Sequence, residues 1–239
     1  MTITSIRWGG RAGIAAVCLF VIGTLLITLL RFNDDPPPGD APPPLTDTQV
    51  QRELPQVSQD NRDTIPTLLR SILSPLLFMA VLYAFKVWMA EYCYAMSDWV
   101  YHVGVIGIIL WVISGIIRVF LLARLANSAN SPIATDTGYS FMWLMASDSF
   151  FDAGFFVISL HASIAGLILI RAGQRWIGGI GVISSVVVMA LLLLNSYEDF
   201  ASYFAFVYAM SVIWLFFLSA LMLLQADKLE HIKGMTPTQ

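Results

Sequence analysis

One histidine and two aspartates stand inside a long apolar stretch, where ionisable side chains are rare. His161, Asp148 and Asp152 all belong to the first of two apolar runs between Asp148 and Asn195, which a short basic segment joins. An ionisable group inside a membrane span is costly, so it often marks a path for an ion, a proton or a substrate. These three residues are therefore the first candidates for a functional site.

Helical periodicity distributes the polar residues of this run over two faces. At 100° per residue, one narrow face carries small and polar residues: Asp148, Asp152, Ser159, Ser163 and Gly166. His161 lies on the opposite face. A helix whose two faces both avoid lipid is expected between neighbouring helices, so we place this span centrally in a bundle.

Asp148 and Asp152 have two interpretations. They can line a wet path for an ion or a polar substrate, or they can cap the helix at its outer, N-terminal end, where the helix dipole favours anions. Nineteen residues separate Asp152 from Arg171, or ~28 Å at helical rise, which is close to the ~30 Å hydrocarbon thickness. Because Arg171 should mark the inner edge, the capping interpretation is favoured.

His161 lies ten residues from Arg171, ~15 Å along a helix and therefore near the bilayer midplane. A histidine there can relay protons, bind haem iron or contact a substrate. The favoured alternative is a structural, neutral imidazole that is hydrogen-bonded to a serine or a backbone carbonyl of a neighbouring span.

Haem b held by two histidines would need His102 as the second ligand. His102 lies four residues from Asp98, only ~6 Å from the inner edge, and the resulting ~9 Å difference in depth disfavours that site. A haem with a single histidine, or with a methionine as second ligand, stays open.

The elements that must position these residues are membrane-spanning helices. The chain has 239 residues, of which 57% are hydrophobic and 12% charged, and its mean hydropathy is +0.74. Apolar runs of about 20 residues, enough to cross the hydrocarbon core, recur at 12–31, 68–89, 99–121, 150–170, 176–195 and 203–225. We predict an all-α, polytopic transmembrane bundle of six spans in one membrane domain (1–239), with no room for a soluble catalytic domain.

Several local features refine this prediction. The proline-rich, acidic stretch 33–64 should be a solvated spacer, and Pro75 should interrupt the second span near Ser71. Lys86 and Trp88 are typical of a membrane interface.

Two more expectations concern the third and fourth spans. A continuous helix from Gly138 to Arg171 would measure ~50 Å, so we expect a separate interfacial segment before the fourth span. Arg118, near the outer end of the third span, should reach toward Asp148 or Asp152.

The fifth span carries small residues along one side. Gly178, Gly181 and Ser185 recur at three- and four-residue spacing, which is typical of helix packing rather than of a site. The GGIG run that begins at Gly178 follows no strand and is no dinucleotide fingerprint. The two cysteines and three histidines show no spacing typical of a metal site.

Charge patterning orients the chain. Seven lysines and arginines fall on the side of the N-terminus and six on the other, and the very short loop with Arg171 and Arg175 adds to the first side. We therefore expect both termini to be cytoplasmic. A net charge of −3 gives no reason to expect nucleic acid as a partner.

The hairpin LILIRAGQRWIGGIGVISSVVVMALLLLN resembles the corresponding part of a family of small six-span bacterial membrane proteins of unknown function. Arg171, Gly173, Arg175 and Gly178 match its span–turn–span pattern, and Gln174 stands where a proline is often found. The opening GGRAGIAAVCLFVIGTLL is similar as well. The resemblance implies a fold and a bacterial inner membrane, but no activity.

Three functions follow from these observations. The favoured one is a non-catalytic structural or accessory subunit, whose partners are the lipid bilayer and other membrane protein subunits. The alternatives are a transporter or channel for a small solute or an ion, which needs a polar path, and a haem-binding redox protein, which rests on His161.

Overall fold

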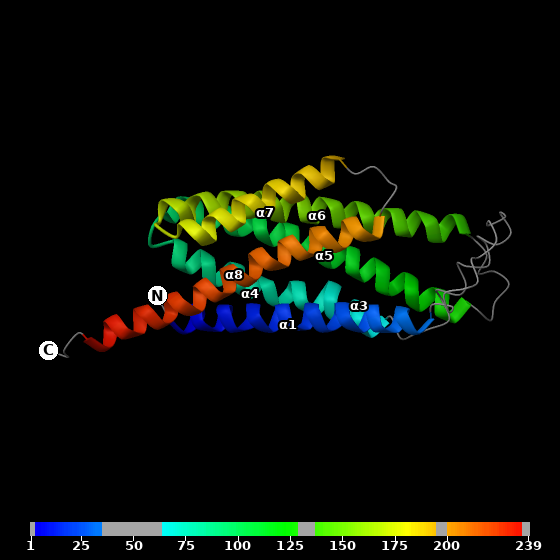
Figure 1. The fold of residues 1–239 in the computed structure, drawn as a ribbon, viewed down its shortest axis with the longest axis horizontal. Coiled ribbons are helices and arrows are strands. Elements are labelled where there is room, and N and C mark those ends of the chain that lie inside the picture. The colour runs from blue at the N-terminus through cyan, green and yellow to red at the C-terminus, as the bar shows by residue number, and fades with distance from the viewer. Residues whose placement is uncertain (1–2, 35–63, 129–136, 195–199, 236–239) are drawn as a thin grey trace.

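The computed structural model describes residues 3–34, 64–128, 137–194 and 200–235. Helices make up this part of the chain apart from two short turns (Figure 1): α1 Ile3–Asp34, α3 Thr64–Leu68, the π-helix η2 Leu69–Leu73, α4 Ser74–Met89, α5 Tyr94–Ser128, α6 Thr137–Arg171, α7 Arg175–Leu194 and α8 Phe200–Met235. Six segments are long and apolar enough to cross a membrane: Ile3–Leu29, Thr64–Met89, Tyr94–Leu121, Met142–Arg171, Arg175–Leu193 and Phe206–Glu230. The all-α fold with six spans is confirmed. The predicted spacer 33–64 lies almost entirely outside the described residues.

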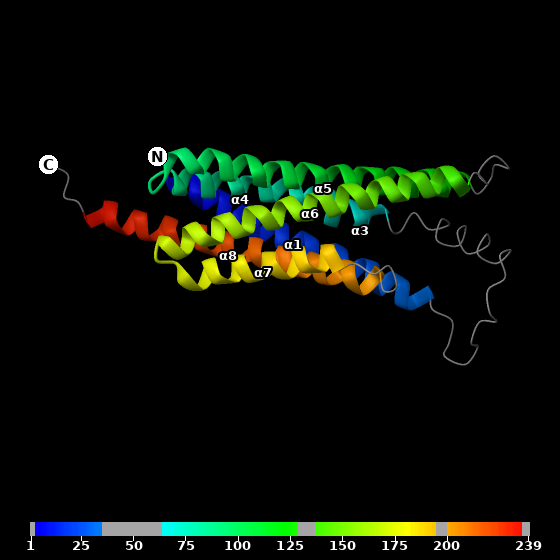
Figure 2. The same ribbon diagram turned by 90° about the horizontal axis from the view of Figure 1, so that it is seen from above.

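The spans form a closed cycle. Each helix in the order α1, α4, α5, α6, α7, α8 packs against the next, and α8 returns to α1. The two views show both termini at one end of the molecule, and α5 and α6 extend beyond α7 and α8 at the other end (Figures 1 and 2). The fourth span, α6, lies between α5 and α7, so it is not the central span that was predicted. That place belongs to α8, which packs against α1, α4, α6 and α7 and is more enclosed.

The prediction of a separate interfacial segment before the fourth span is wrong. Helix α6 begins at Thr137 and continues without a break to Arg171. The preceding helix, α5, continues to Ser128, so its C-terminal part lies beside the N-terminal part of α6. The rings of Phe120 and Trp143 lie 6.4 Å apart there. A neighbour of equal length thus supports the part of α6 that exceeds the bilayer core.

The second span has an irregular segment close to Pro75, where the sequence predicted an interruption. The π-helix η2 interrupts the span at Leu69–Leu73, and α4 then starts with Pro75 in its first turn. The wider π turn fits against glycines: a Cβ on Gly115 of α5 would lie 2.5 Å from the carbonyl oxygen of Ser71. Below this turn, Ser74 Oγ donates a hydrogen bond to Ala16 O of α1 at 2.9 Å.

Lys86 and Trp88, the two residues predicted for a membrane interface, differ in burial. Lys86 Nζ forms an ion pair with Asp98 Oδ1 at 2.5 Å and lies 5.0 Å from the centre of the Tyr101 ring. Trp88 is 2% exposed and stacks on Phe85 inside the bundle. Only two positions separate the partly exposed Lys86 from the buried Trp88, and run length does not show this difference.

Five aromatic side chains from five helices fill the middle of the bundle. The ring of Trp111 on α5 lies 6.4 Å from Phe20 of α1, 6.4 Å from Phe78 of α4, 4.8 Å from Phe155 of α6 and 5.6 Å from Tyr208 of α8. All five are less than one-tenth exposed. We call this set the aromatic layer.

Candidate functional site

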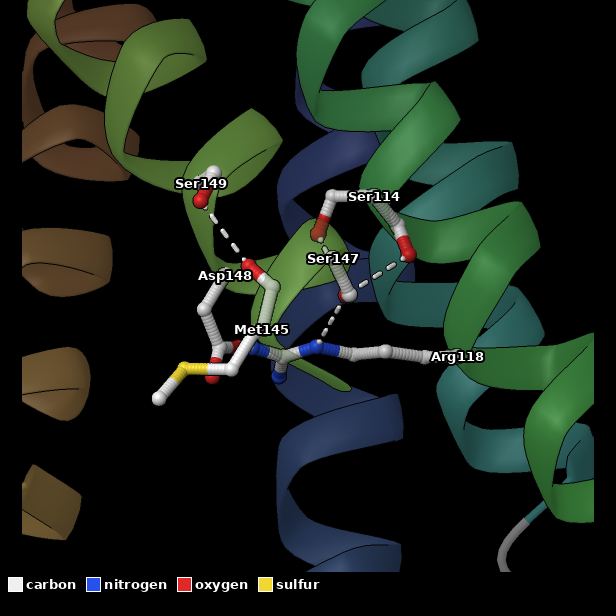
Figure 3. A network of polar contacts seen from close by, with 6 residues as sticks. All are labelled: Ser114, Arg118, Met145, Ser147, Asp148 and Ser149. Atoms are coloured by element: carbon white, nitrogen blue, oxygen red, sulfur yellow. Dashed lines mark hydrogen bonds and ion pairs between the residues drawn. The ribbon is translucent and has the colours of Figure 1, made fainter. Parts of the chain in front are cut away.

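A polar network joins α5 and α6 in the half of the bundle that lies away from the two chain termini (Figure 3). Arg118 Nη2 donates to Asp148 Oδ1 at 2.6 Å, and Arg118 Nε donates to Ser147 Oγ at 3.0 Å. Ser147 Oγ in turn donates to Ser114 O at 3.1 Å, and the two serine hydroxyls lie 3.1 Å apart. Ser114, Arg118, Ser147 and Asp148 form what we call the α5–α6 polar network.

The network confirms that Arg118 reaches Asp148 and corrects the role of both aspartates. Helix α6 begins at Thr137, so Asp148 and Asp152 lie well inside the helix, where they cannot cap its N-terminus. The favoured capping interpretation is therefore wrong. Both partners of the ion pair are mostly buried, because the side chains of Arg118 and Asp148 are 20% and 14% exposed. The guanidinium also lies 5.5 Å from the centre of the Phe151 ring.

Asp152 lies one helical turn further into the bundle, and it interacts electrostatically with Asp148 and Arg118. Its Oδ1 atom is buried and has no hydrogen-bond partner within the described part of the chain. One arginine therefore faces two carboxylates, of which it binds only one directly. Asp152 is the member of the predicted set whose bonding is incomplete.

His161 is buried elsewhere, between α4, α5 and α6. It is 1% exposed, and its ring meets Phe85 edge to face at 6.3 Å. Gly104 makes room for it, since a Cβ at that position would lie 2.9 Å from His161 Cδ2. The predicted structural hydrogen bond is not found for Nε2, which has no partner among the residues that the structure describes.

His102 does not join His161, but the predicted reason was wrong. His161 packs against Gly104, only two residues or ~3 Å from His102 along α5, so the two histidines are similar in depth. They differ in direction. His102 is exposed and its Nδ1 donates to Asp98 O at 2.6 Å, whereas His161 is enclosed. The two imidazoles therefore do not face a common space.

The predicted polar stripe on α6 does not continue from the aspartates to the serines. Ser159 Oγ donates to Phe155 O of its own helix at 2.8 Å. Ser163 is hydrogen-bonded to Ser185 of α7. Intramembrane hydroxyls commonly bond in these two ways, and only the second bond ties two helices together. The candidate residues thus separate into three places: the aspartates, His161 and the serines.

The small residues predicted to pack α7 lie against two different neighbouring helices. A Cβ on Gly178 would lie 2.5 Å from Gly166 O of α6, so the two backbones touch there. Gly181 instead faces α8, where a Cβ would lie 2.6 Å from the Trp214 ring. Together with Ser185 these residues serve two neighbouring helices, because one side of α7 fits between α6 and α8.

Two polar features were missed. Ser114 and Ser147 belong to the α5–α6 polar network, and the four-residue spacing of Ser114 and Arg118 is the signal that was available. Arg7 of α1 bonds Asp227 of α8 at 3.2 Å and also Glu230. These partners stand at opposite ends of the sequence, so only the closed helix cycle brings them together.

His161 allows a direct prediction. Because His161 Nε2 makes no hydrogen bond with the described residues, His161→Leu leaves no other polar group without its partner at that atom. The substitution should therefore change the free energy of unfolding by less than about 1 kcal/mol. His161→Gln should also be tolerated. Thermal unfolding in detergent measures both variants. If Leu lowers stability by several times that amount, His161 has a partner that the described contacts do not include.

A scan against protein-family models found no match, and searches of curated proteins and of solved structures found no significant match either. The resemblance to a six-span bacterial family therefore stays a prediction.

Proposed function

We propose that this multi-pass membrane protein is a non-catalytic structural or accessory subunit of a membrane complex. One observation carries the proposal: the aromatic layer fills the bundle between its outer and inner halves. The α5–α6 polar network lies outward of Trp111 on α5, and His161 lies inward of it at the level of Gly104. A transport path needs continuous polar lining, and here the large rings of the aromatic layer lie between these two polar sites.

The polar groups themselves support the same function. Arg118 and Asp148 tie α5 to α6, Ser163 and Ser185 tie α6 to α7, and Arg7 ties α1 to α8. Each bond connects neighbouring members of the helix cycle. Polar residues that hold helices together are expected in a rigid scaffold.

The test is purification at native abundance. A tagged chain extracted from its own membrane in mild detergent should run as a complex with another membrane protein at a constant molar ratio, measured by native mass spectrometry. Deleting the chain should lower the abundance of that partner's assembled form. A chain that runs alone at full stability, and whose deletion leaves every membrane complex intact, would refute the proposal.

We further propose that both termini are cytoplasmic in a bacterial inner membrane. Support comes from the contact of Arg7 with Asp227 and Glu230. This contact requires the start of the first span and the end of the last span to lie on the same side of the membrane. The charged turn with Arg171 and Arg175 lies at the same end (Figure 1).

Cysteine labelling tests this orientation. On a Cys18→Ala, Cys93→Ala background, Val50→Cys should react with an impermeant maleimide in intact cells, because residue 50 is expected outside. Gln174→Cys should react only after the membrane is opened. The reverse pattern would show that the termini face outward.

A second candidate is an ion-coupled transporter. The specific observation in its favour is that two titratable side chains, Asp152 and His161, each have a buried atom with no hydrogen-bond partner among the described residues (Oδ1 and Nε2). The purified chain in vesicles that contain a pH dye should then carry protons, and Asp152→Asn should abolish the flux without unfolding the protein. Silent vesicles with folded protein would leave the accessory function as the better proposal.

A further inference from the structure

The turn between α6 and α7 is short and held by its own hydrogen bonds. Gly173 has a positive φ of 84°, a conformation that glycine adopts without steric cost. Gln174 N–H donates to Leu169 O at 2.8 Å and Gly173 N–H donates to Ile170 O at 3.1 Å. This pair of bonds is the Schellman motif that ends many helices. These hydrogen bonds therefore fix the position of the last residue of α6 relative to the first residue of α7.

Those flanking residues are Arg171, the last residue of α6, and Arg175, the first of α7. Both side chains are exposed, and within the described residues neither forms an ion pair. Two other basic residues at this end are paired with carboxylates: Arg7 with Asp227 and Glu230, and Lys86 with Asp98. The turn thus presents two uncompensated positive charges in one place.

The turn also presents an aromatic side chain. Trp176 is 88% exposed, and it follows Arg175 directly at the start of an apolar span. A turn of three residues between two spans must lie at the membrane surface. Tryptophan prefers that level, where its ring lies among headgroups and upper acyl chains. Arginine there can bind phosphate oxygens with two parallel N–H groups.

We propose that this turn is a binding surface for the headgroup phosphate of an anionic phospholipid. Arg171 and Arg175 bind the phosphate, and Trp176 packs along the lipid beneath it. The proposal does not need the accessory-subunit function, but it rests on the cytoplasmic orientation proposed above for this turn. The occupant is argued from charge complementarity, since two unpaired cations face a leaflet in which anionic lipids carry the opposite charge.

The experiment is a lipid titration of the purified full-length protein, followed by native mass spectrometry. Phosphatidylglycerol is compared with phosphatidylcholine and with inorganic phosphate. Each basic residue near a lipid surface contributes about fivefold in affinity, so Arg171→Gln, Arg175→Gln should weaken the tightest phosphatidylglycerol site by about 25-fold. Phosphatidylcholine binding should not change, and inorganic phosphate should not displace the lipid.

A matched variant separates this surface from net charge. Arg11→Gln, Lys228→Gln removes two charges that are also exposed at the same end of the molecule, and should keep phosphatidylglycerol affinity within about twofold. The Arg171→Lys, Arg175→Lys variant keeps the charge and should bind at an intermediate level. Circular dichroism checks the folding of every variant. Equal weakening in the matched variant overturns the proposal, and so does effective competition by free phosphate.

Discussion

Replacing Arg118 with methionine should destabilise the bundle by about 3 kcal/mol, because it removes the cation that faces two mostly buried carboxylates, Asp148 and Asp152. Asp148 would lose its 2.6 Å partner, and Asp152 would face the like charge of Asp148 without the attraction of Arg118. Ser147 would also lose the donor that its hydroxyl accepts from. The measurement is thermal or denaturant-induced unfolding in a defined detergent.

A double-mutant cycle separates the ion pair from general loss of packing. Asp148→Asn should lower stability less than Arg118→Met does. In that variant Arg118 still donates its hydrogen bond to Ser147 and is still attracted to the charge of Asp152. The combination Arg118→Met, Asp148→Asn should recover part of the loss, which gives a coupling energy of at least about 1 kcal/mol. Arg11→Met is the control, because this exposed residue makes no ion pair with the described residues and its loss should cost less than about 0.5 kcal/mol. Additive losses would mean that the pair contributes nothing.

The number and type of elements followed from run length, because a hydrocarbon core requires about 20 apolar residues whatever their identity. Helix ends did not follow. Helix α6 starts at Thr137 because α5 accompanies it, and no single run shows a neighbour's length. The capping role assigned to Asp148 and Asp152 failed for that reason alone. The apolar run defines where a helix meets lipid, not where it begins.

The candidate site was predictable in part. Arg118 and Asp148 carry opposite charges near the facing ends of consecutive antiparallel spans, and few other partners were available to either. His161 was different: its surroundings come from Phe85 on α4 and Gly104 on α5, and periodicity within α6 says nothing about them. The same limit applies to α7, where Gly178 and Gly181 share a spacing pattern but face different helices.

Two adjacent glycines on α7 make the sharpest test of the packing. A Cβ on Gly178 would lie 2.5 Å from Gly166 O and 2.8 Å from Ile170 N, both of them backbone atoms that cannot rotate away. Nothing lies within 4 Å of the corresponding position on Gly179. Alanine exceeds glycine in helix propensity by about 1 kcal/mol at either position, so propensity cancels in the comparison.

Gly178→Ala should therefore destabilise the bundle by about 2 kcal/mol net of propensity, the usual cost of overpacking a tight contact. Gly179→Ala should be neutral or stabilising by up to about 1 kcal/mol. Gly166→Ala should resemble Gly178→Ala, and the double variant should cost less than the sum, because one separation of α6 from α7 accommodates both methyl groups. Equal unfolding midpoints for Gly178→Ala and Gly179→Ala would show that α6 and α7 do not touch at this level.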